Sequence, residues 1–182
     1  MLDNRSVDVK NMIGNKDFFA REFLIWLWFM SEKDQGNIKL DDDTNITLFI
    51  EDKLVLEELL GDQEDLFKGG IPSESIEAKY ALKSGKIIKE CKIKIIKGNA
   101  SLSEQQFEWI FNFKAEGFNI SGIKLPAVDV KDYREKLRHR MFSLEELYDY
   151  LGSLYKTFLN IRLDKPTWDE NLITIKEWIG EE

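Results

Sequence analysis

The sequence REFLIWLWFMSE, residues 21–32, decides more about the fold than any other segment. Between its charged ends, eight apolar residues follow one another without a break: Phe23, Leu24, Ile25, Trp26, Leu27, Trp28, Phe29 and Met30. Phe23, Trp26 and Met30 recur at helical spacing, and the opposite face is apolar as well. A helix that is apolar all round is buried on every side, within a core or against a partner. We therefore predict a buried helix that ends near Lys33, with Phe23, Trp26 and Trp28 as candidate interface residues.

The size and composition of the chain fit one globular domain. It has 182 residues, of which 43% are hydrophobic and 33% are charged, and its formal net charge is -8. This length suits one domain, or one domain with an arm. Residues 1–15 lack any periodicity, so we expect a flexible N-terminal arm there and a single domain over residues 16–182. The acidic balance argues against a protein that coats nucleic acid with its whole surface, but it leaves room for a local basic patch.

The cysteine count and the longest apolar run suggest where the protein works. Cys91 is the only cysteine, which excludes an internal disulfide framework and a cysteine-based zinc site. A single free cysteine fits a reducing compartment. The eight-residue apolar run is far below the roughly 20 residues that span a bilayer. The polar N-terminus does not read as a secretory signal. We expect a cytoplasmic protein with no membrane partner.

The order of periodic segments predicts an α+β fold. After the first helix, residues 38–40 and 46–56 alternate as in a β-hairpin. We expect an acidic loop over residues 59–72 and a short helix that starts at Ser73 or Ser75 and ends before Gly85. Three more strands are expected: residues 87–97, 106–114 and 118–125. The last third reads as helices: residues 131–141, a second helix capped by Ser143 and Glu146 that reaches about Ile161, and a final one over residues 171–179. This pattern predicts an antiparallel sheet of about five or six strands with helices packed against it.

Residues with catalytic or ligand-binding chemistry are sparse. His139 is the only histidine and lies among arginines, which favours a solvated role. Cys91 alternates with Ile93 and Ile95, which favours a buried thiol. Asp41, Asp42 and Asp43 lack the spacing of a calcium loop, and Gly69-Gly70 lacks the lysine of a phosphate-binding loop. We expect no catalytic residue, no metal site and no cofactor.

The charges are segregated along the sequence. Residues 76–99 carry seven lysines against two glutamates, and residues 130–140 carry five cations against two acids. Ten acids oppose one lysine over residues 41–65. A cationic surface that neutralises phosphates binds nucleic acid without sequence preference and with strong salt dependence. The candidate DNA-binding residues are Lys86, Lys89, Lys92, Lys94, Arg134 and Arg138. The open alternative is that they belong to ordinary solvated faces balanced by acidic neighbours.

One strand is aromatic on a single face. Phe107, Trp109, Phe111 and Phe113 alternate with charged and amide residues. Such a face stacks single-stranded bases in some proteins. The polar alternates favour the other interpretation, in which the aromatic rings belong to the sheet core.

Several segments together resemble one known family. DFFAREFLIWLWFMSEK, residues 17–33, resembles the FLGREFLTWLW segment of shorter, divergent bacterial members of the RdgC-like, recombination-associated family. In the same order, ALKSGKIIKECKIKI resembles the family's helix, Gly-Lys-Val/Ile-Val and strand, and FEWIFNFKAEGFNISGIKLP resembles its following hairpin. The leucine-rich MFSLEELYDYLGSLYKTFL also fits. The likeness spans roughly residues 17–162 and corresponds to the C-terminal part of longer members.

The resemblance implies a cytoplasmic, nucleoid-associated homodimer. Members of the family pass duplex DNA through a basic channel, bind it with little sequence preference and restrain RecA-driven recombination. The expected partners are therefore duplex DNA, a second copy of the chain and recombination proteins. Most of the family's N-terminal half has no counterpart here, so ring closure does not follow from the likeness.

Two other functions remain open from the sequence. The chain could be a non-enzymatic protein-interaction module that docks through the tryptophan-rich helix, since tryptophan is enriched among interface hot spots. It could also be a metal-dependent nuclease, which needs several convergent carboxylates. The acids on or beside neighbouring predicted strands are Glu77, Glu90 and Glu108.

Overall fold

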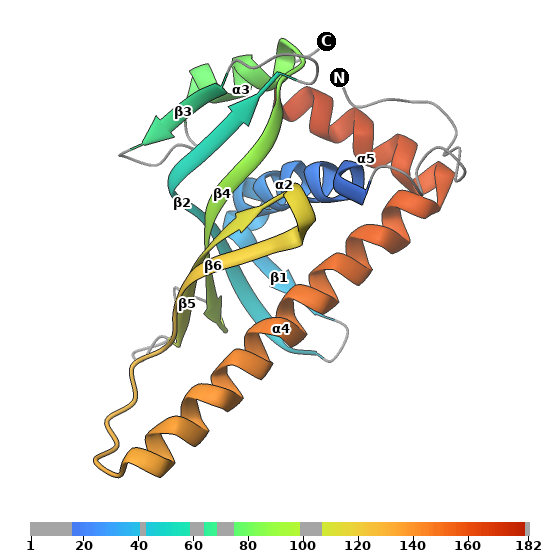
Figure 1. The fold of residues 1–182 in the computed structure, drawn as a ribbon. Coiled ribbons are helices and arrows are strands. Elements are labelled where there is room, and N and C mark those ends of the chain that lie inside the picture. The colour runs from blue at the N-terminus through green and yellow to red at the C-terminus, as the bar shows by residue number, and fades with distance from the viewer. Residues whose placement is uncertain (1–15, 41–42, 59–63, 69–74, 99–106, 181–182) are drawn as a thin grey trace.

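A computed structural model describes residues 16–40, 43–58, 64–68, 75–98 and 107–180. It is an α+β fold in which helices lie against one face of a six-stranded antiparallel sheet (Figure 1). The strand order is β1-β2-β4-β5-β6, and β3 also pairs with β2. The strands are β1 (Asn37–Lys39), β2 (Asn45–Glu57), β3 (Glu64–Lys68), β4 (Ile87–Lys97), β5 (Glu108–Lys114) and β6 (Asn119–Lys124). The helices are α2 (Lys16–Glu32), α3 (Ile76–Lys83), α4 (Tyr133–Leu163) and α5 (Lys165–Trp178), with short 3-10 turns at Lys33–Gly36 and Glu116–Phe118.

The predicted fold class and most predicted elements are confirmed. Alternation places Cys91, Ile93 and Ile95 of β4 in the core, where each is fully buried. The side chain of Ser75 accepts a hydrogen bond from the backbone N–H of Ala78 and caps α3. Gly117, at φ +66°, lies in the turn between β5 and β6. Among the described residues, none of the helices combines the length and the apolar content that crossing a bilayer requires.

Strand β2 is the central strand of the β1–β4 part of the sheet, because it pairs along both of its edges. On one edge its first residues pair with β1 and its last residues with β3, and on the other edge it pairs with β4. Glu51 and Asp52 interrupt its apolar alternation without ending the strand. The register with β4 shifts between Ile50 and Leu54, so the strand absorbs the interruption as an irregularity.

The predicted loop over residues 59–72 is wrong in part, because residues 64–68 form strand β3. This strand lies at the sheet edge, and its side chains alternate between exposed and half-buried. Phe67 is the side chain of β3 that packs against the core. A single apolar anchor in an acidic segment gives almost no periodic signal, which explains why the sequence did not reveal the strand.

The predicted break between two helices near Ser143 is also wrong. Residues 133–163 form one helix, α4, which begins at an Asp132 cap that accepts a hydrogen bond from the backbone N–H of Glu135. Ser143 does not cap a helix. Its hydroxyl and its carbonyl oxygen accept hydrogen bonds from the indole N–H of Trp109, at 2.9 and 2.8 Å. No glycine or proline lies near residue 143, so the helix has no local reason to stop.

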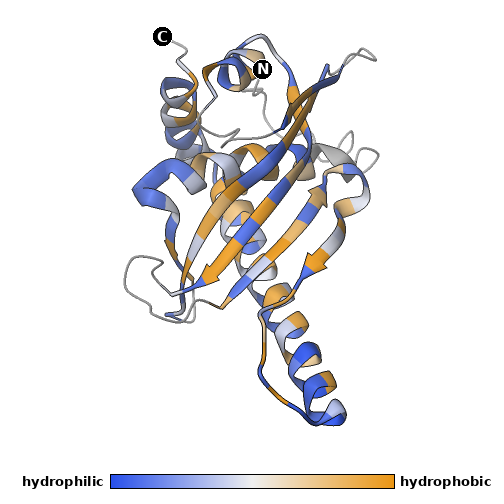
Figure 2. Cartoon of the chain, turned by 90° about the vertical axis from the view of Figure 1, so that its left-hand side faces the viewer, coloured by the Kyte–Doolittle hydropathy of each residue, from blue (hydrophilic) through white to orange (hydrophobic). Residues whose placement is uncertain are grey.

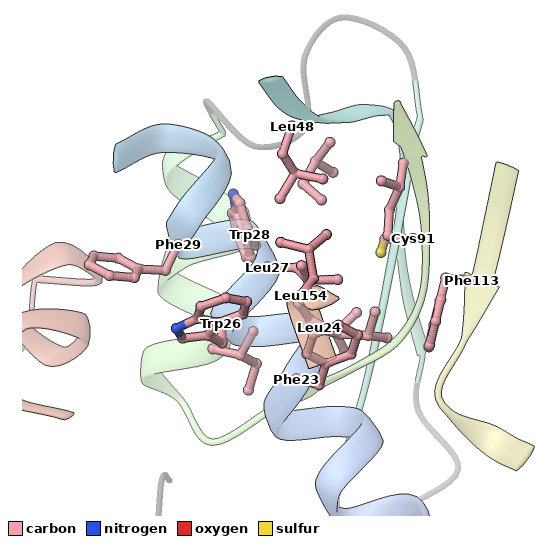
Figure 3. Packing of buried hydrophobic residues seen from close by; sticks show 14 of the residues in the cluster. Phe23, Leu24, Trp26, Leu27, Trp28, Phe29, Leu48, Cys91, Phe113 and Leu154 are labelled. Carbon is pink, nitrogen blue, oxygen red and sulfur yellow. The ribbon is translucent and has the colours of Figure 1, made fainter. Parts of the chain in front are cut away.

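Helix α2 is the centre of the core, between the sheet and the helices α4 and α5 (Figures 1 and 3). The ring of Phe23 lies 6.0 Å from that of Phe113 on β5 and 5.5 Å from that of Phe158 on α4. Trp28 meets Trp178 of α5 edge-on at 5.0 Å. The prediction of a buried helix is therefore confirmed: residues 22–29 are buried by other parts of the same chain, and Met30 is half-buried.

That burial corrects the predicted interface. Phe23, Trp26 and Trp28 are at most 1% exposed. The sheet covers one side of α2, and α4 and α5 cover the other, so these three side chains present no surface to a partner. An all-apolar helix can be buried within its own domain or against a partner, and here its own domain buries it.

A buried ion pair fastens α2 to α4. The Nε of Arg162 donates to Oε2 of Glu22 at 2.7 Å, and the two side chains are 4% and 5% exposed. The guanidinium also lies 4.7 Å from the ring of Trp168 on α5. Three helices therefore meet at one charged contact between residues 140 positions apart.

Candidate functional site

The six predicted DNA-binding residues fall into two separate groups in the structure. Lys86, Lys89, Lys92 and Lys94 lie on or just before β4. Arg134 and Arg138 lie on the first part of α4, which extends away from the sheet (Figures 1 and 2). The fold therefore does not bring these six residues together into one cationic surface.

Each of the four lysines has a carboxylate partner. The pairs are Lys86 with Asp65 at 2.6 Å, Lys89 with Glu57 at 3.3 Å and also with Glu64, Lys92 with Asp52 at 2.7 Å, and Lys94 with Glu51 at 2.8 Å. The hydrogen bond from Lys92 lowers the pKa of the Asp52 carboxyl, and the hydrogen bonds to Glu64 and Glu57 raise the pKa of Lys89. The acidic segment and the lysine-rich segment are separate in the sequence. In the sheet, however, β3 pairs with β2 and β2 pairs with β4, so the acids of β2 and β3 lie near the lysines of β4. The charges that are segregated along the chain are thus neutralised in space.

A hollow of about 420 Å³ on the sheet gathers further lysines. Its lining includes Lys53, Lys68, Lys92 and Lys124. Lys53 binds Glu90 at 2.5 Å and Lys92 binds Asp52, so half of these cations are already compensated. The hollow is shallow and exposed, and surface lysines alone do not define a binding site.

The outer part of α4 is the most exposed ordered element of the described chain. Residues 131–142 are all exposed, and residues 133–142 form a helical extension, called here the α4 extension. Figure 2 shows it standing clear of the sheet. The extension belongs to the same 31-residue helix as the packed part of α4, so it needs no nucleus of its own, but its own side chains are not covered by the domain.

A continuous apolar stripe runs along α4. Its members follow alternating spacings of four and three residues: Leu137, Met141, Leu144, Tyr148, Leu151, Tyr155 and Phe158. Such a 3.5-residue period is typical of a helix that packs lengthwise against another helix. The inner half of the stripe is covered by the domain, since Leu151 and Phe158 are buried. Most of the outer half is not covered: Leu137 is 49%, Met141 55% and Tyr148 55% exposed, whereas Leu144 is half-buried.

The domain holds α4 by a neighbouring face and leaves the outer stripe open. Leu147 and Tyr150 are buried, and the ring of Tyr150 lies 5.5 Å from that of Trp109 on β5. Tyr133, one turn before Leu137, is 77% exposed. Large exposed apolar patches rimmed by polar residues mark interaction surfaces. We define the outer stripe as Tyr133, Leu137, Met141, Leu144 and Tyr148.

Charged residues flank the outer stripe. The cations of the α4 extension and the residues just before it are Lys131, Arg134, Lys136, Arg138 and Arg140, all exposed. Within the part of the chain that the structure describes, the ion pair recorded for the extension joins His139 to Glu135 at 4.0 Å. Arg134 and Arg138 are therefore exposed cations beside an exposed apolar stripe.

The residues that could serve catalysis are not gathered in one place. Cys91 is buried, and burial raises the pKa of its thiol. His139 is exposed on α4, as expected. Glu90 pairs with Lys53 at one end of the β4–β5 ladder, Glu108 lies at the other end, and Glu77 binds Ser75 on α3. Over residues 16–40, 43–58, 64–68, 75–98 and 107–180, no group of three histidines, cysteines or acids could hold a metal ion.

Some predicted features lie outside the described residues. They are the N-terminal arm over residues 1–15, most of the Asp41–Asp43 turn and the Gly69-Gly70 pair. Asp43 itself is described and pairs with Lys39 at 2.7 Å. The aromatic face of β5 belongs to the core, because Trp109, Phe111 and Phe113 are buried, but Phe107 precedes the strand and is 49% exposed.

Comparison of the sequence with protein-family models and with curated proteins, and of the fold with solved structures, found no match. The resemblance to the recombination-associated family therefore stays a prediction. The functional argument depends on the surface of the chain itself.

Proposed function

We propose that this chain works by binding and not by catalysis, and that its α4 extension binds another protein chain. The single observation that carries the proposal is the outer stripe, which continues the core-packing period of α4 into solvent. This is the protein-interaction function considered from the sequence, but the proposed binding surface lies on α4, because α2 is buried.

The energetics favour a protein partner over solvent. Full burial of a leucine or methionine side chain contributes about 1.5–3 kcal/mol. Leu137 and Met141 lie one helical turn apart and are about half exposed. A second helix that covered the outer stripe would bury both side chains together with the two tyrosines. It would also cover part of an extension whose residues 133–142 are all exposed.

Site-specific photo-crosslinking in the source organism tests the proposal. A photoreactive phenylalanine analogue replaces Leu137 in one version of the full chain and Ile173 in a control. Ile173 is 59% exposed on α5, so it matches Leu137 in chemistry and exposure. The expected result is an adduct at position 137, with the attached peptide identified by mass spectrometry, and none at position 173. Equal labelling at both positions, or none at either, overturns the proposal.

Non-specific duplex DNA binding is the second candidate function. The observation that favours it is the set of exposed cations on and beside the α4 extension, which are free to meet phosphates. The family resemblance points the same way and adds recombination control and a nucleoid location. The paired lysines of β4 contribute less to this candidate than the sequence suggested, because each would have to leave a carboxylate.

A mobility-shift titration with random duplex DNA tests this second candidate. Arg134→Gln with Arg138→Gln is expected to weaken binding and to lower the salt dependence by about two phosphate contacts. The control, Lys92→Gln with Lys94→Gln, is expected to change binding much less. If the control is the more damaging change, or if the duplex does not bind at low salt, the cations of α4 are not a DNA surface.

A further inference from the structure

We propose that the partner of the α4 extension is a second copy of this chain, bound antiparallel through the outer stripe. This inference depends on the proposed function and names its partner. Two α4 helices would cross at a two-fold axis near Phe142, so that each extension lies along the other.

The apolar layers are self-complementary in this arrangement. An antiparallel pair in a 3.5-residue period stacks Leu137 on Tyr148 of the second copy, and Met141 on Leu144 of the second copy. The same contacts recur on the other side of the axis, as in any two-fold interface. The stripe from residue 133 to residue 148 is about 24 Å long at 1.5 Å per residue. Both halves of every layer therefore come from one segment, in which Leu144 is half-buried and the other three side chains are exposed.

The charges along one edge of the stripe follow the same symmetry. Arg134 and Arg138 lie one turn apart on this edge, and Glu145 and Asp149 continue it towards the domain. All four side chains are exposed. Antiparallel pairing brings Arg138 opposite Glu145 of the second copy and Arg134 opposite Asp149 of the second copy. One helix thus carries both the cationic and the anionic half of a complementary pair.

This charge order favours a second copy over other occupants. An acidic peptide would satisfy the arginines and would repel Glu145 and Asp149. An anionic membrane surface would do the same. Only a partner that is acidic opposite the outer turns and basic opposite the inner turns fits the whole edge. The helix itself, turned round, has that pattern.

Charge-exchange variants of the full chain test the pairing. One variant carries Arg134→Glu and Arg138→Glu, which makes the edge wholly acidic. The other carries Glu145→Arg and Asp149→Arg, which makes it wholly basic. Light scattering measures the mass of each purified variant, of their equimolar mixture and of the wild type. A charge reversal elsewhere, Lys165→Glu on α5, is the control.

The wild type is expected to give a species of twice 21.4 kDa that dissociates on dilution. Each variant alone is expected to dimerise about tenfold more weakly or worse, and the mixture to recover the dimer. Leu137→Glu with Met141→Glu is expected to raise the dissociation constant about 100-fold or more, whereas Ile173→Glu leaves it unchanged. Circular dichroism verifies that every variant is folded.

The inference and the proposed function fail in different ways. A wild-type chain that stays monomeric overturns the inference, and so does a variant mixture that dimerises no better than its parts. If the chain is monomeric and photo-crosslinking at position 137 identifies a different protein, the proposed function stands and only the second copy is excluded. If the chain is monomeric and position 137 forms no adduct, both fall.

Discussion

Replacing Glu22 by glutamine probes the contact that joins the first helix to the last two. The wild-type carboxylate accepts from Arg162 through Nε at 2.7 Å and Nη2 at 3.5 Å. Glutamine keeps the shape of the side chain and removes its charge. The guanidinium, which is 4% exposed and lies over Trp168, is then buried without a counter-charge.

The expected loss of stability follows from that uncompensated charge. Removal of one partner of a buried ion pair costs about 3–5 kcal/mol, and the isosteric change places Glu22→Gln near about 3 kcal/mol. In a domain of this size each kcal/mol shifts the melting temperature by about 2–4 °C, so the midpoint is expected to fall by about 6–12 °C. Replacing both partners, with Glu22→Leu and Arg162→Met, is expected to recover most of the loss because no charge remains buried.

Urea unfolding followed by tryptophan fluorescence gives the free energies of this cycle. The control is Lys97→Gln, which breaks a half-exposed pair with Glu146 and is expected to cost less than about 1 kcal/mol. If Glu22→Gln lowers the free energy of unfolding no more than Lys97→Gln does, the buried ion pair does not stabilise the contact between α2 and α4. The reasoning would also be refuted if the double variant lost as much stability as the sum of the losses of Glu22→Leu and Arg162→Met, each measured alone.

Three further changes test the fold. Gly36→Ala is expected to cost about 2 kcal/mol more than Gly98→Ala in denaturant titrations, since both have positive φ but a Cβ at Gly36 meets the Leu48 carbonyl oxygen at 2.2 Å; equal costs would contradict the close approach. Trp109→Phe is expected to cost about 1–3 kcal/mol, because it leaves acceptors on α4 without a donor, and a neutral result would show that the two hydrogen bonds do not stabilise the fold. The raised pKa of Cys91 contributes stability that is complete below the unfolded thiol's pKa near 8.5 and is lost as pH rises above it. Between pH 9 and 10 the wild type should therefore lose about 1.2 kcal/mol more than Cys91→Ala, and parallel pH profiles would exclude a thiol kept neutral by burial.

Local patterns in the sequence predicted the elements whose signal is local. The all-apolar run of α2, the alternation of Cys91 with Ile93, and the cap at Ser75 each report their own surroundings. The predicted break in α4 was wrong because the pattern of Ser143 followed by Glu146 occurs inside helices as well as at their N-termini. The side chain of Ser143 instead serves Trp109, which is 34 residues earlier in the sequence. No local pattern contains that contact.

The candidate site depended on long-range pairing even more strongly. The lysines of β4 were correctly placed together, but their neutralisation depends on which strands lie beside β4. The outer stripe was legible as a period in the sequence. Its exposure was not, because exposure follows from where the sheet ends relative to α4. Glu22 and Arg162 are 140 positions apart, and the local sequence around either residue gives no signal that predicts their ion pair.

The position of α2 ahead of the sheet and of α4 and α5 in the sequence has a consequence for synthesis. The ribosome releases this helix before the strands that cover one side of it and before the helices that cover the other side. A nascent chain therefore carries eight adjacent apolar residues in the open for most of its elongation. Folding must wait for contacts between distant residues, which slows it and exposes the intermediate to aggregation. Newly made chains are expected to depend on chaperone binding at this segment until residue 178 has emerged.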